Sequence, residues 1–497
     1  MGKEEDLKLV NEYQKEFALL SQINQMLEWD LETYLPRKGN EDRAEQSSLI
    51  EKLNHEKFAS DELFNALERL RKESLSEDES KMFERLYNDV LKARKLPSEF
   101  VEEFSRAASL AFDAWQEAKQ KSDFSIFKPH LEKLVELNKK KADYIGLEGH
   151  PYNSLMDDFE EGMTVEKLKP KFEELKKGIL DILNRIKCSQ EYKNQKRSLF
   201  LGKGFSKEKQ LKLAEDVRKR IGLSEGFSRL DIAEHPFCVQ PGYEDIRVTT
   251  NIKDSPLFCF LSTIHESGHG LYEFNLPKEF RYTSLGEAPS FGIHESQSRF
   301  WEIMLAKRRP FWEFYFDKFK EAFGVEDFEQ LIKEINMVEP SLIRIESDEL
   351  HYILHIILRF EIELDLVEGN IEVKDLPEIW NRKMEQMFGI VPESDSEGVL
   401  QDVHWSHGAF GYFPTYALGS VYAAQIYNKI KEEVPEFEED IKNGNYSMVR
   451  EWLKENVHQK GRKYLADEII SQVCGSGLNP QEFLKYLEDK YSEFYSI

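Results

Sequence analysis

Cysteine is scarce in this chain of 497 residues, which contains only four. They are widely separated and form no Cys-x-x-Cys pair: Cys188, Cys238, Cys259 and Cys474. This pattern argues against a disulfide framework and against a zinc site built from thiolates. No stretch approaches the about 18 uninterrupted apolar residues of a membrane span. Lysine and arginine together number 68, against 93 aspartate and glutamate residues. The resulting formal net charge of −25 opposes binding to nucleic acid or to an anionic membrane surface.

The chain has no Gly-, Ser- or Pro-rich linker and no repeat of fixed period, which favours one cooperative body over separate domains. Most of it shows helical periodicity, as in residues 165–183, where apolar residues step by three and four after Thr164. We therefore predict a mainly α fold in one domain, 1–497. Residues 1–200 are expected to form helices along a deep substrate groove, and residues 201–497 to carry the chemistry. A short hairpin or small sheet is predicted at 236–239 and 245–250.

The start of the chain, from Met1 to Asp6, is mostly charged and has no apolar core. Such a segment does not resemble a secretory signal, and Asp6 does not fit a myristoylation pattern. We therefore expect a cytoplasmic protein.

The motif His265-Glu266-Ser267-Gly268-His269 carries the strongest chemical signal in the sequence. Four residues advance an α-helix by slightly more than one turn, so both imidazoles project from one face and can hold one metal ion. A catalytic zinc site uses three protein ligands and one open position for water, and Glu266 is placed to accept a proton from that water. The motif predicts a metallopeptidase. The alternative is a buried helix whose histidines bond to backbone or carboxylate groups.

The residues around this motif predict a buried helix. Ser255 and Pro256 are typical of a helix start, with the serine as cap and the proline in the first helical position. The residues that follow are apolar on all sides. Gly268 costs a helix about 1 kcal/mol relative to alanine, and the close approach of another element would explain its presence.

A third ligand is expected from a second helix that opens near Pro289. Glu295 and His294 are both candidates by chemistry alone. We favour Glu295 because its helical neighbours, which include Arg299 and Glu302, make a polar face suited to a carboxylate that binds metal.

Two further groups of polar residues follow between Arg344 and His355. Asp348, His351 and His355 share one helical face, which fits either a second metal site or a hydrogen-bonded polar wall. We favour the wall, because no glutamate occupies the position of a base. The Arg344 guanidinium can bind a free C-terminal carboxylate with a bidentate fork, although a structural salt bridge to Asp348 is the alternative at this spacing.

Residues 398–416 are dense in glycine, aromatic side chains and hydrogen-bond donors. A zinc peptidase needs donors aimed at the oxyanion of its tetrahedral intermediate, and tyrosine hydroxyls or imidazoles can supply them. The alternative is that such an aromatic stretch serves packing. The candidate donors are His404, His407, Tyr412 and Tyr416.

Several motifs in one order resemble the carboxypeptidase Taq family of zinc metallocarboxypeptidases, and the resemblance covers nearly the whole chain. They are Trp29-Asp30-Leu31-Glu32-Thr33-Tyr34-Leu35-Pro36, Arg43-Ala44-Glu45-Gln46, the His-Pro-Phe of His235, Asp245-x-Arg247-x-Thr249, the zinc helix, the His-Glu-Ser-Gln of His294, Ile343-Arg344 with Asp348, and Gly398-x-x-Gln401-Asp402-x-His404-Trp405.

This resemblance implies a helical fold with a long deep groove, akin to angiotensin-converting enzyme and the thimet-type oligopeptidases, and assembly as a homodimer. It implies Glu295 as the third ligand, zinc or cobalt in the site, and broad release of single amino acids from peptide C-termini. It also favours Arg344 as the carboxylate binder. In the more distant oligopeptidases a histidine precedes two catalytic tyrosines, and His407, Tyr412 and Tyr416 are similar in arrangement.

Together these inferences describe a zinc enzyme whose substrates are peptides with a free C-terminus. Glu266 accepts a proton and passes it to the leaving amine, while His235, His407 and a tyrosine stabilise the oxyanion. The residues expected to contact the substrate, including its terminal carboxylate, are Arg344, Arg247, Gln401 and His404.

Two alternatives belong to other classes of protein. Glu266-x-x-His269 with Glu295, and Asp348-x-x-His351, faintly resemble the Glu-x-x-His pairs of ferritin-like bundles, so a redox protein with a dinuclear iron centre is one of them. The other is a noncatalytic helical scaffold that holds a structural metal. Metal content distinguishes the first from a zinc peptidase, and loss of the fold on chelation without any peptidase activity identifies the second.

Overall fold

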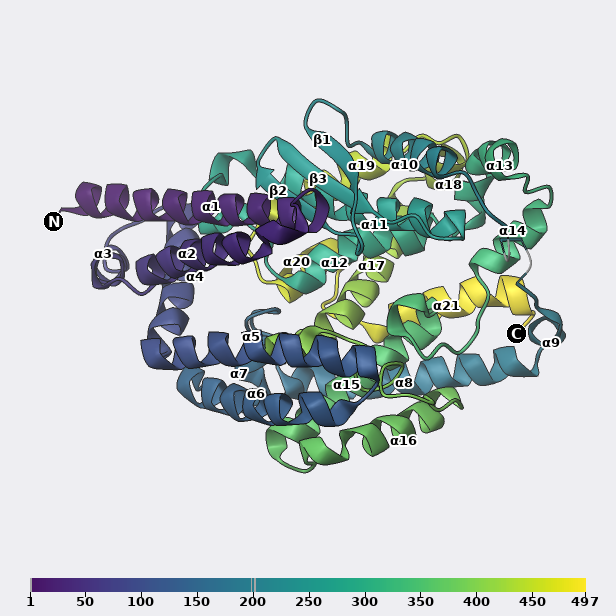
Figure 1. Ribbon diagram of the computed structural model, residues 1–497. Helices are drawn as coiled ribbons and strands as arrows, with labels where there is room; N and C mark the ends of the chain where they lie inside the picture. The colour runs from purple at the N-terminus through teal and green to yellow at the C-terminus, as the bar shows by residue number, and fades with distance from the viewer. Residues whose placement is uncertain (1, 198, 201–202) are drawn as a thin grey trace.

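Most residues described by the computed structural model, which are 2–197, 199–200 and 203–497, lie in helices (Figure 1). The helices before the sheet are α1 (Lys3–Thr33), α2 (Asn40–Phe58), α3 (Asp61–Leu70), α4 (Glu77–Lys95), α5 (Ser98–Lys121), α6 (Phe124–Ile145), α7 (Tyr152–Met156), α8 (Val165–Cys188), α9 (Gln190–Asn194) and α10 (Lys207–Ile221). After the sheet come α11 (Pro256–Asn275), α12 (Phe291–Arg299), α13 (Arg309–Phe323), α14 (Phe328–Ile335), α15 (Glu349–Glu368), α16 (Leu376–Phe388), α17 (Pro414–Glu433), α18 (Phe437–Lys442), α19 (Ser447–Asn456), α20 (Ala466–Cys474) and α21 (Pro480–Tyr495). The predicted mainly α fold is confirmed.

A small sheet forms the β part of the structure, in the order β1-β3-β2. Its strands are β1 (Ser228–Ile232), β2 (Cys238–Gly242) and β3 (Asp245–Thr250). β2 and β3 pair antiparallel, which confirms the predicted hairpin, whereas the parallel partner β1 was not anticipated from the sequence. The sheet packs on α11, because a Cβ at Gly270 would lie 2.7 Å from the Ile246 side chain of β3.

The elements that carry the metal motif lie in the middle of the molecule. In Figure 1, α11 lies between the sheet above it and α12 and α17 below it, while α5, α6, α7, α8, α15 and α16 make the lower part. α11 and α17 both contact α12, so this short helix is held from two sides. The site is therefore built between elements far apart in the sequence.

Buried side chains form two hydrophobic clusters. The smaller one comes from α1, α3 and α4, with Leu285 added to it. The larger one extends from α5 to α21 and includes the sheet. The packing thus groups α5–α8 with the C-terminal part of the chain, whereas the subregions expected from the sequence divide at residue 200.

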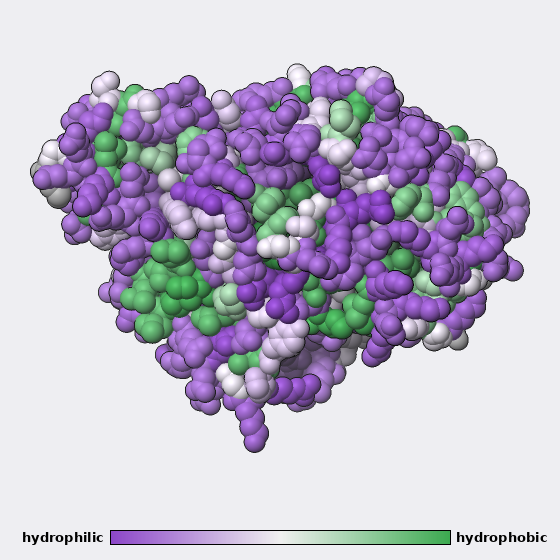
Figure 2. Space-filling view, turned by 90° about the horizontal axis from the view of Figure 1, so that it is seen from above, coloured by the Kyte–Doolittle hydropathy of each residue, from purple (hydrophilic) through white to green (hydrophobic). Residues whose placement is uncertain are grey.

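The surface seen from above is mostly hydrophilic and is interrupted by hydrophobic areas (Figure 2). Among the exposed apolar side chains, two pairs lie at a spacing of four residues, Leu19 and Ile23 on α1 and Leu49 and Leu53 on α2. Each pair therefore shares one face of its helix. Within the described residues, every helix is too short or too polar to cross a membrane.

Candidate metal centre

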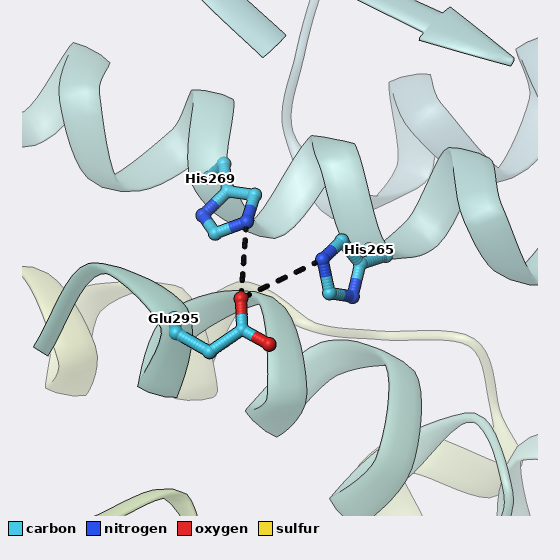
Figure 3. Close-up of side chains that lie close together, drawn as sticks. All are labelled: His265, His269 and Glu295. Carbon is cyan, nitrogen blue, oxygen red and sulfur yellow. Dashed lines mark ion pairs between the residues drawn. The ribbon is translucent and has the colours of Figure 1, made fainter. Parts of the chain in front are cut away.

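Three side chains converge between α11 and α12 (Figure 3). His265 and His269 project from α11, and Glu295 reaches them from α12. Glu295 Oε2 lies 3.7 Å from His265 Nε2 and 3.5 Å from His269 Nε2. One ligand atom from each residue lies within 4.8 Å of the other two, and the described part of the chain holds no second group of this kind. Two imidazoles and one carboxylate are the donor set of a catalytic zinc site.

Local sequence explains why the two helices meet here. Ser290 caps α12 by accepting a hydrogen bond from the Ile293 N–H. The cap predicted at Ser255 is wrong, because its side chain makes no hydrogen bond at the start of α11. A Cβ at Gly268 would lie 2.7 Å from the Gln297 carbonyl oxygen of α12. The close approach predicted from Gly268 is therefore present. Its consequence is that the histidines on α11 lie within reach of Glu295.

Polar partners fix the orientation of His265 and Glu295. His265 Nδ1 lies 2.9 Å from Glu302 Oε2, so its Nε2 faces Glu295. Arg299 Nε donates to Glu295 Oε1 at 2.7 Å, and the Ser298 hydroxyl donates to Glu295 Oε2 at 3.0 Å. The polar face expected around Glu295 therefore serves the metal ligands. Glu302 lies in η4 (Phe300–Leu305), a π-helical turn that continues α12.

The charges of the site favour a cation. Burial alone raises the pKa of Glu295, but Arg299 and both histidines outweigh it and hold that pKa well below its usual value. Burial lowers the pKa of His265, yet Glu295, Glu302 and Glu266 raise it to about 9. The carboxylates around His265 therefore favour positive charge at this place, and a divalent cation can supply it. Burial and the neighbouring His294 lower the pKa of His269 to about 3, which keeps its imidazole neutral, as metal binding requires.

Glu266 is suited to act as a base beside these ligands. Its side chain follows His265 on α11, and the residue is 7% exposed. Burial and the charge of Glu295 raise the pKa of Glu266 to about 7, although His265 acts to lower it. A carboxylate with a pKa near the working pH can both accept and return a proton.

We expect the Glu302→Gln variant to bind zinc roughly 10- to 100-fold more weakly than the natural protein, and Glu302→Ala more weakly still. The charge of Glu302 supports His265 through the 2.9 Å contact, and losing such a partner has effects of this size. Competition with a chromophoric chelator measures the affinity. Glu208→Gln removes an exposed carboxylate on α10 and serves as the control. Equal affinities of Glu302→Ala and the control would contradict the role of Glu302.

The structure brings together His404, Tyr412 and Tyr416 from the candidate oxyanion donors. His404 Nε2 lies 3.1 Å from the Tyr416 hydroxyl, and the rings of Tyr412 and Tyr416 are 5.3 Å apart. Burial and the charge of Glu295 raise the pKa of Tyr412 to about 12, so its hydroxyl keeps its proton. His407 is instead exposed and stacks on Phe112 of α5 at 5.1 Å. It does not join the tyrosines.

Arg344 is buried and bound to Asp402. Its Nε and Nη2 donate to Asp402 Oδ1 at 3.1 and 2.8 Å, and its Nη1 donates to the Tyr352 hydroxyl at 3.1 Å. The alternative of a salt bridge to Asp348 is wrong. These bonds use one hydrogen on each nitrogen, so Nη1 and Nη2 each retain one further N–H. The guanidinium lies 4.8 Å from the centre of the Tyr416 ring, on the side of the proposed oxyanion donors.

Gln401 and Arg247, which were predicted to contact substrate, have protein partners, whereas His235, predicted for the oxyanion, lies apart from the site. The Gln401 side chain accepts from the backbone N–H of Arg344 and from Arg359, and it donates to three backbone carbonyls. Arg247 pairs with Asp245. His235 is exposed in the loop between β1 and β2, and no described contact joins it to the metal ligands.

The residues weighed as a second metal site form a hydrogen-bonded wall instead. Asp348 caps α15 and lies 2.6 Å from His351 Nδ1, while His355 Nε2 lies 3.0 Å from the Ser341 carbonyl oxygen. These contacts confirm the wall within the described residues. They also leave the dinuclear iron hypothesis without its second set of ligands.

One pair beside the metal ligands was missed in the sequence. His294 stacks on His269 at 4.5 Å, and its Nε2 lies 2.8 Å from Glu273. Glu273 is four residues beyond His269 on α11, so helical spacing could have identified it as a neighbour of the metal ligands. Both residues line a cavity of about 490 Å³ that also touches α4 and α12. His294 connects this cavity to the metal ligands, because its ring stacks on that of His269.

Comparison with known proteins decides the family. The model of the carboxypeptidase Taq (M32) metallopeptidase family matches residues 9–491. The chain belongs to this family. It is 39% identical to Carboxypeptidase 1 of Bacillus subtilis over 98% of this chain and all of that protein, and 36% identical to Thermostable carboxypeptidase 1 of Pyrococcus furiosus over 94% of each. The crystal structure of an M32 carboxypeptidase from Deinococcus radiodurans is similar, with a TM-score of 0.95, 36% identity and coverage of 99% of this chain and 100% of that one. The family predicted from the motifs is confirmed.

Proposed function

We propose that this member of the M32 metallopeptidases is a zinc-dependent carboxypeptidase that releases single amino acids from peptide C-termini with broad specificity. The convergence of His265, His269 and Glu295 beside the buried Glu266 is the observation that carries the proposal. The two histidines and one carboxylate leave room for a fourth position, which distinguishes catalytic from structural zinc sites. Cobalt suits the same donors and is a possible substitute.

A metal ion held by His265, His269 and Glu295 would polarise the scissile carbonyl and lower the pKa of the attacking water. Glu266 accepts a proton from that water on its carboxylate and returns it to the leaving amine. The pKa of Glu266, which burial raises to about 7, suits both transfers. Tyr412 and Tyr416 keep their hydroxyl protons and donate hydrogen bonds to the oxyanion. His404 orients Tyr416 through the 3.1 Å contact. His235 and His407 lie outside this group of contacts, so we assign the oxyanion to the tyrosines.

Arg344 is our assignment for the group that binds the free C-terminal carboxylate. The remaining N–H groups on its Nη1 and Nη2 can donate to one carboxylate, and Asp402 and Tyr352 hold the guanidinium in place. Gln401 supports this position through the backbone N–H of Arg344. An anchor of this kind limits cleavage to the end of a peptide. Arg247 and His404 are further candidates for contact with the substrate.

We also propose that the enzyme works in the cytoplasm as a homodimer. Its four cysteines are free in the structure, which suits a reducing compartment. The exposed apolar pairs on α1 and α2 would be covered by a second copy. Sedimentation of the purified protein tests the dimer directly.

A set of peptides of graded length, read by mass, tests the proposed activity. We expect sequential loss of C-terminal residues, full inhibition by a chelator and recovery with zinc. Peptides with an amidated C-terminus are the matched control, and their resistance would support the carboxylate anchor. Internal cleavage, or hydrolysis that a chelator does not affect, would contradict the proposal.

A further inference from the structure

A second cavity, of about 400 Å³, lies between the end of α10 and the turn that precedes α19. Its charged lining consists of Lys219, Arg220 and Arg450 with one carboxylate, Asp216. None of the lining residues is a metal ligand. In a chain with a net charge of −25, a concave surface with an excess of positive side chains is unusual.

The two arginines of this cavity have no carboxylate partner within the described residues. Arg220 Nη1 donates to the Gly444 carbonyl at 3.2 Å, and Arg450 Nη1 donates to the Arg220 carbonyl at 3.4 Å. Asp216 does not neutralise them, because its carboxylate binds Lys318 and the Tyr315 hydroxyl. Both guanidiniums are half-buried, so water solvates their charge only in part. An anion in the cavity would complete the ion pairs that the chain itself does not supply.

Two buried donors at the same place lack a hydrogen-bond partner. One is the hydroxyl of Tyr446, a lining residue that is 2% exposed, and the other is Nε of Arg220. The charges of Arg220 and Asp216 both act on the Tyr446 hydroxyl, which places it among the charged lining groups. A buried donor without an acceptor destabilises the folded protein, and an acceptor supplied by a ligand would remove this cost.

A purely structural role explains only part of this arrangement. Lys219 and Arg220 lie in the last turn of α10, where positive side chains favour the helix dipole, and Arg220 also lies 4.4 Å from the centre of the Phe314 ring. Neither interaction accounts for Arg450, which reaches the cavity from α19, nor for the unpartnered tyrosine hydroxyl.

We infer that this cavity binds a phosphate group, either as the free ion or as part of a small molecule. A tetrahedral oxyanion accepts hydrogen bonds from several directions and carries up to two negative charges. Two guanidiniums and a hydroxyl match that demand better than they match a flat carboxylate, whereas the exposed Lys219 ammonium is already paired with Glu225. The inference is independent of the peptidase reaction, since the cavity shares no residue with the metal centre.

Thermal unfolding of the zinc-loaded protein in graded inorganic phosphate, at constant ionic strength, tests the site. We expect the Tm to rise with phosphate concentration, because a ligand that binds the folded state stabilises it. Isothermal titration gives the affinity. Arg450→Gln is expected to weaken it at least about tenfold, the effect of losing one charge-assisted contact. Tyr446→Phe, which removes only the hydroxyl, is expected to weaken it by a smaller factor and guards against loss of the fold.

Lys212→Gln is the control, because it removes a positive charge from an exposed position on α10 outside the cavity. Its affinity for phosphate should equal that of the natural protein. Phosphate binding that persists in both Arg450→Gln and Tyr446→Phe would place the ion elsewhere, for example at the metal, and would overturn the inference. Equal stabilisation by succinate would overturn the assignment to phosphate. Equal affinity for phosphate and for a small phosphate ester identifies the phosphate group itself as the ligand.

Discussion

The Glu266→Gln variant is expected to lose roughly 10²- to 10⁴-fold in kcat on peptides while it still binds one zinc ion per chain. A positioned general base contributes a factor of this size, and an amide cannot accept the proton. Glu266 is not among the three converging ligands, so the metal affinity should change little. Steady-state kinetics on a peptide ladder and metal analysis of the same sample measure both quantities.

Glu279→Gln makes the same chemical change at an exposed position just beyond α11 and serves as the control. It should keep the kcat of the natural protein. If Glu266→Gln retained zinc and hydrolysed peptides at the natural rate, the assignment of Glu266 as the base would be wrong. A variant that lost both zinc and activity would instead show that Glu266 supports the ligands.

The sequence predicted those parts of the site that depend on helical spacing. His265 and His269 share one face of α11 because four residues separate them, and Arg299 meets Glu295 for the same reason on α12. The choice between Glu295 and His294 was harder, since neighbouring residues on a helix point about 100° apart and chemistry permits both. Only the packing of α12 against α11 turns Glu295 toward the histidines and His294 toward Glu273.

Parts of the site that lie outside regular elements could not be located in this way. His404 and His407 both belong to η7 (His404–His407), a 3₁₀ turn that leads into a loop, and no fixed periodicity relates them to Tyr412 or Tyr416. The resemblance to the oligopeptidases favoured His407, whereas the chain path places His404 beside the tyrosines. The partner of Arg344 was missed for a similar reason, because Asp402 is 58 residues away in the chain.

The fold likewise divides into features that local sequence predicts and features that depend on contacts between distant segments. The helices and the β2–β3 hairpin were predictable because local periodicity and turn residues specify them. The strand β1 pairs in parallel with β3 across an intervening segment, so its pairing depends on tertiary contacts. The grouping of α5–α8 with the C-terminal core also depends on contacts between distant segments, and composition alone gave no sign of it.

Replacement of Gly268 by alanine is expected to weaken zinc binding roughly 10- to 100-fold and to lower stability by about 1–3 kcal/mol, the range observed for overpacking and for disturbed ligand orientation. An alanine inside a helix is ordinarily favourable by about 1 kcal/mol. Here the added Cβ would lie 2.7 Å from the Gln297 carbonyl oxygen and 2.8 Å from the Ser298 Cα. Both are backbone atoms of α12, so the helix must move. Glu295 then moves away from His265 and His269.

Chelator competition and thermal unfolding, each with and without zinc, measure the two effects of Gly268→Ala. Gly204→Ala is the control, because a Cβ at that position meets nothing within 4 Å. A second variant, Gly419→Ala, acts from the opposite side of α12, where the new Cβ would lie 2.6 Å from Glu295 Cγ. It should weaken zinc binding in the same way. If both variants bound zinc as tightly as the control and Gly268→Ala were stabilised, helix propensity would outweigh packing. The close contact of α12 with its two neighbours would then not be what holds Glu295 at the metal.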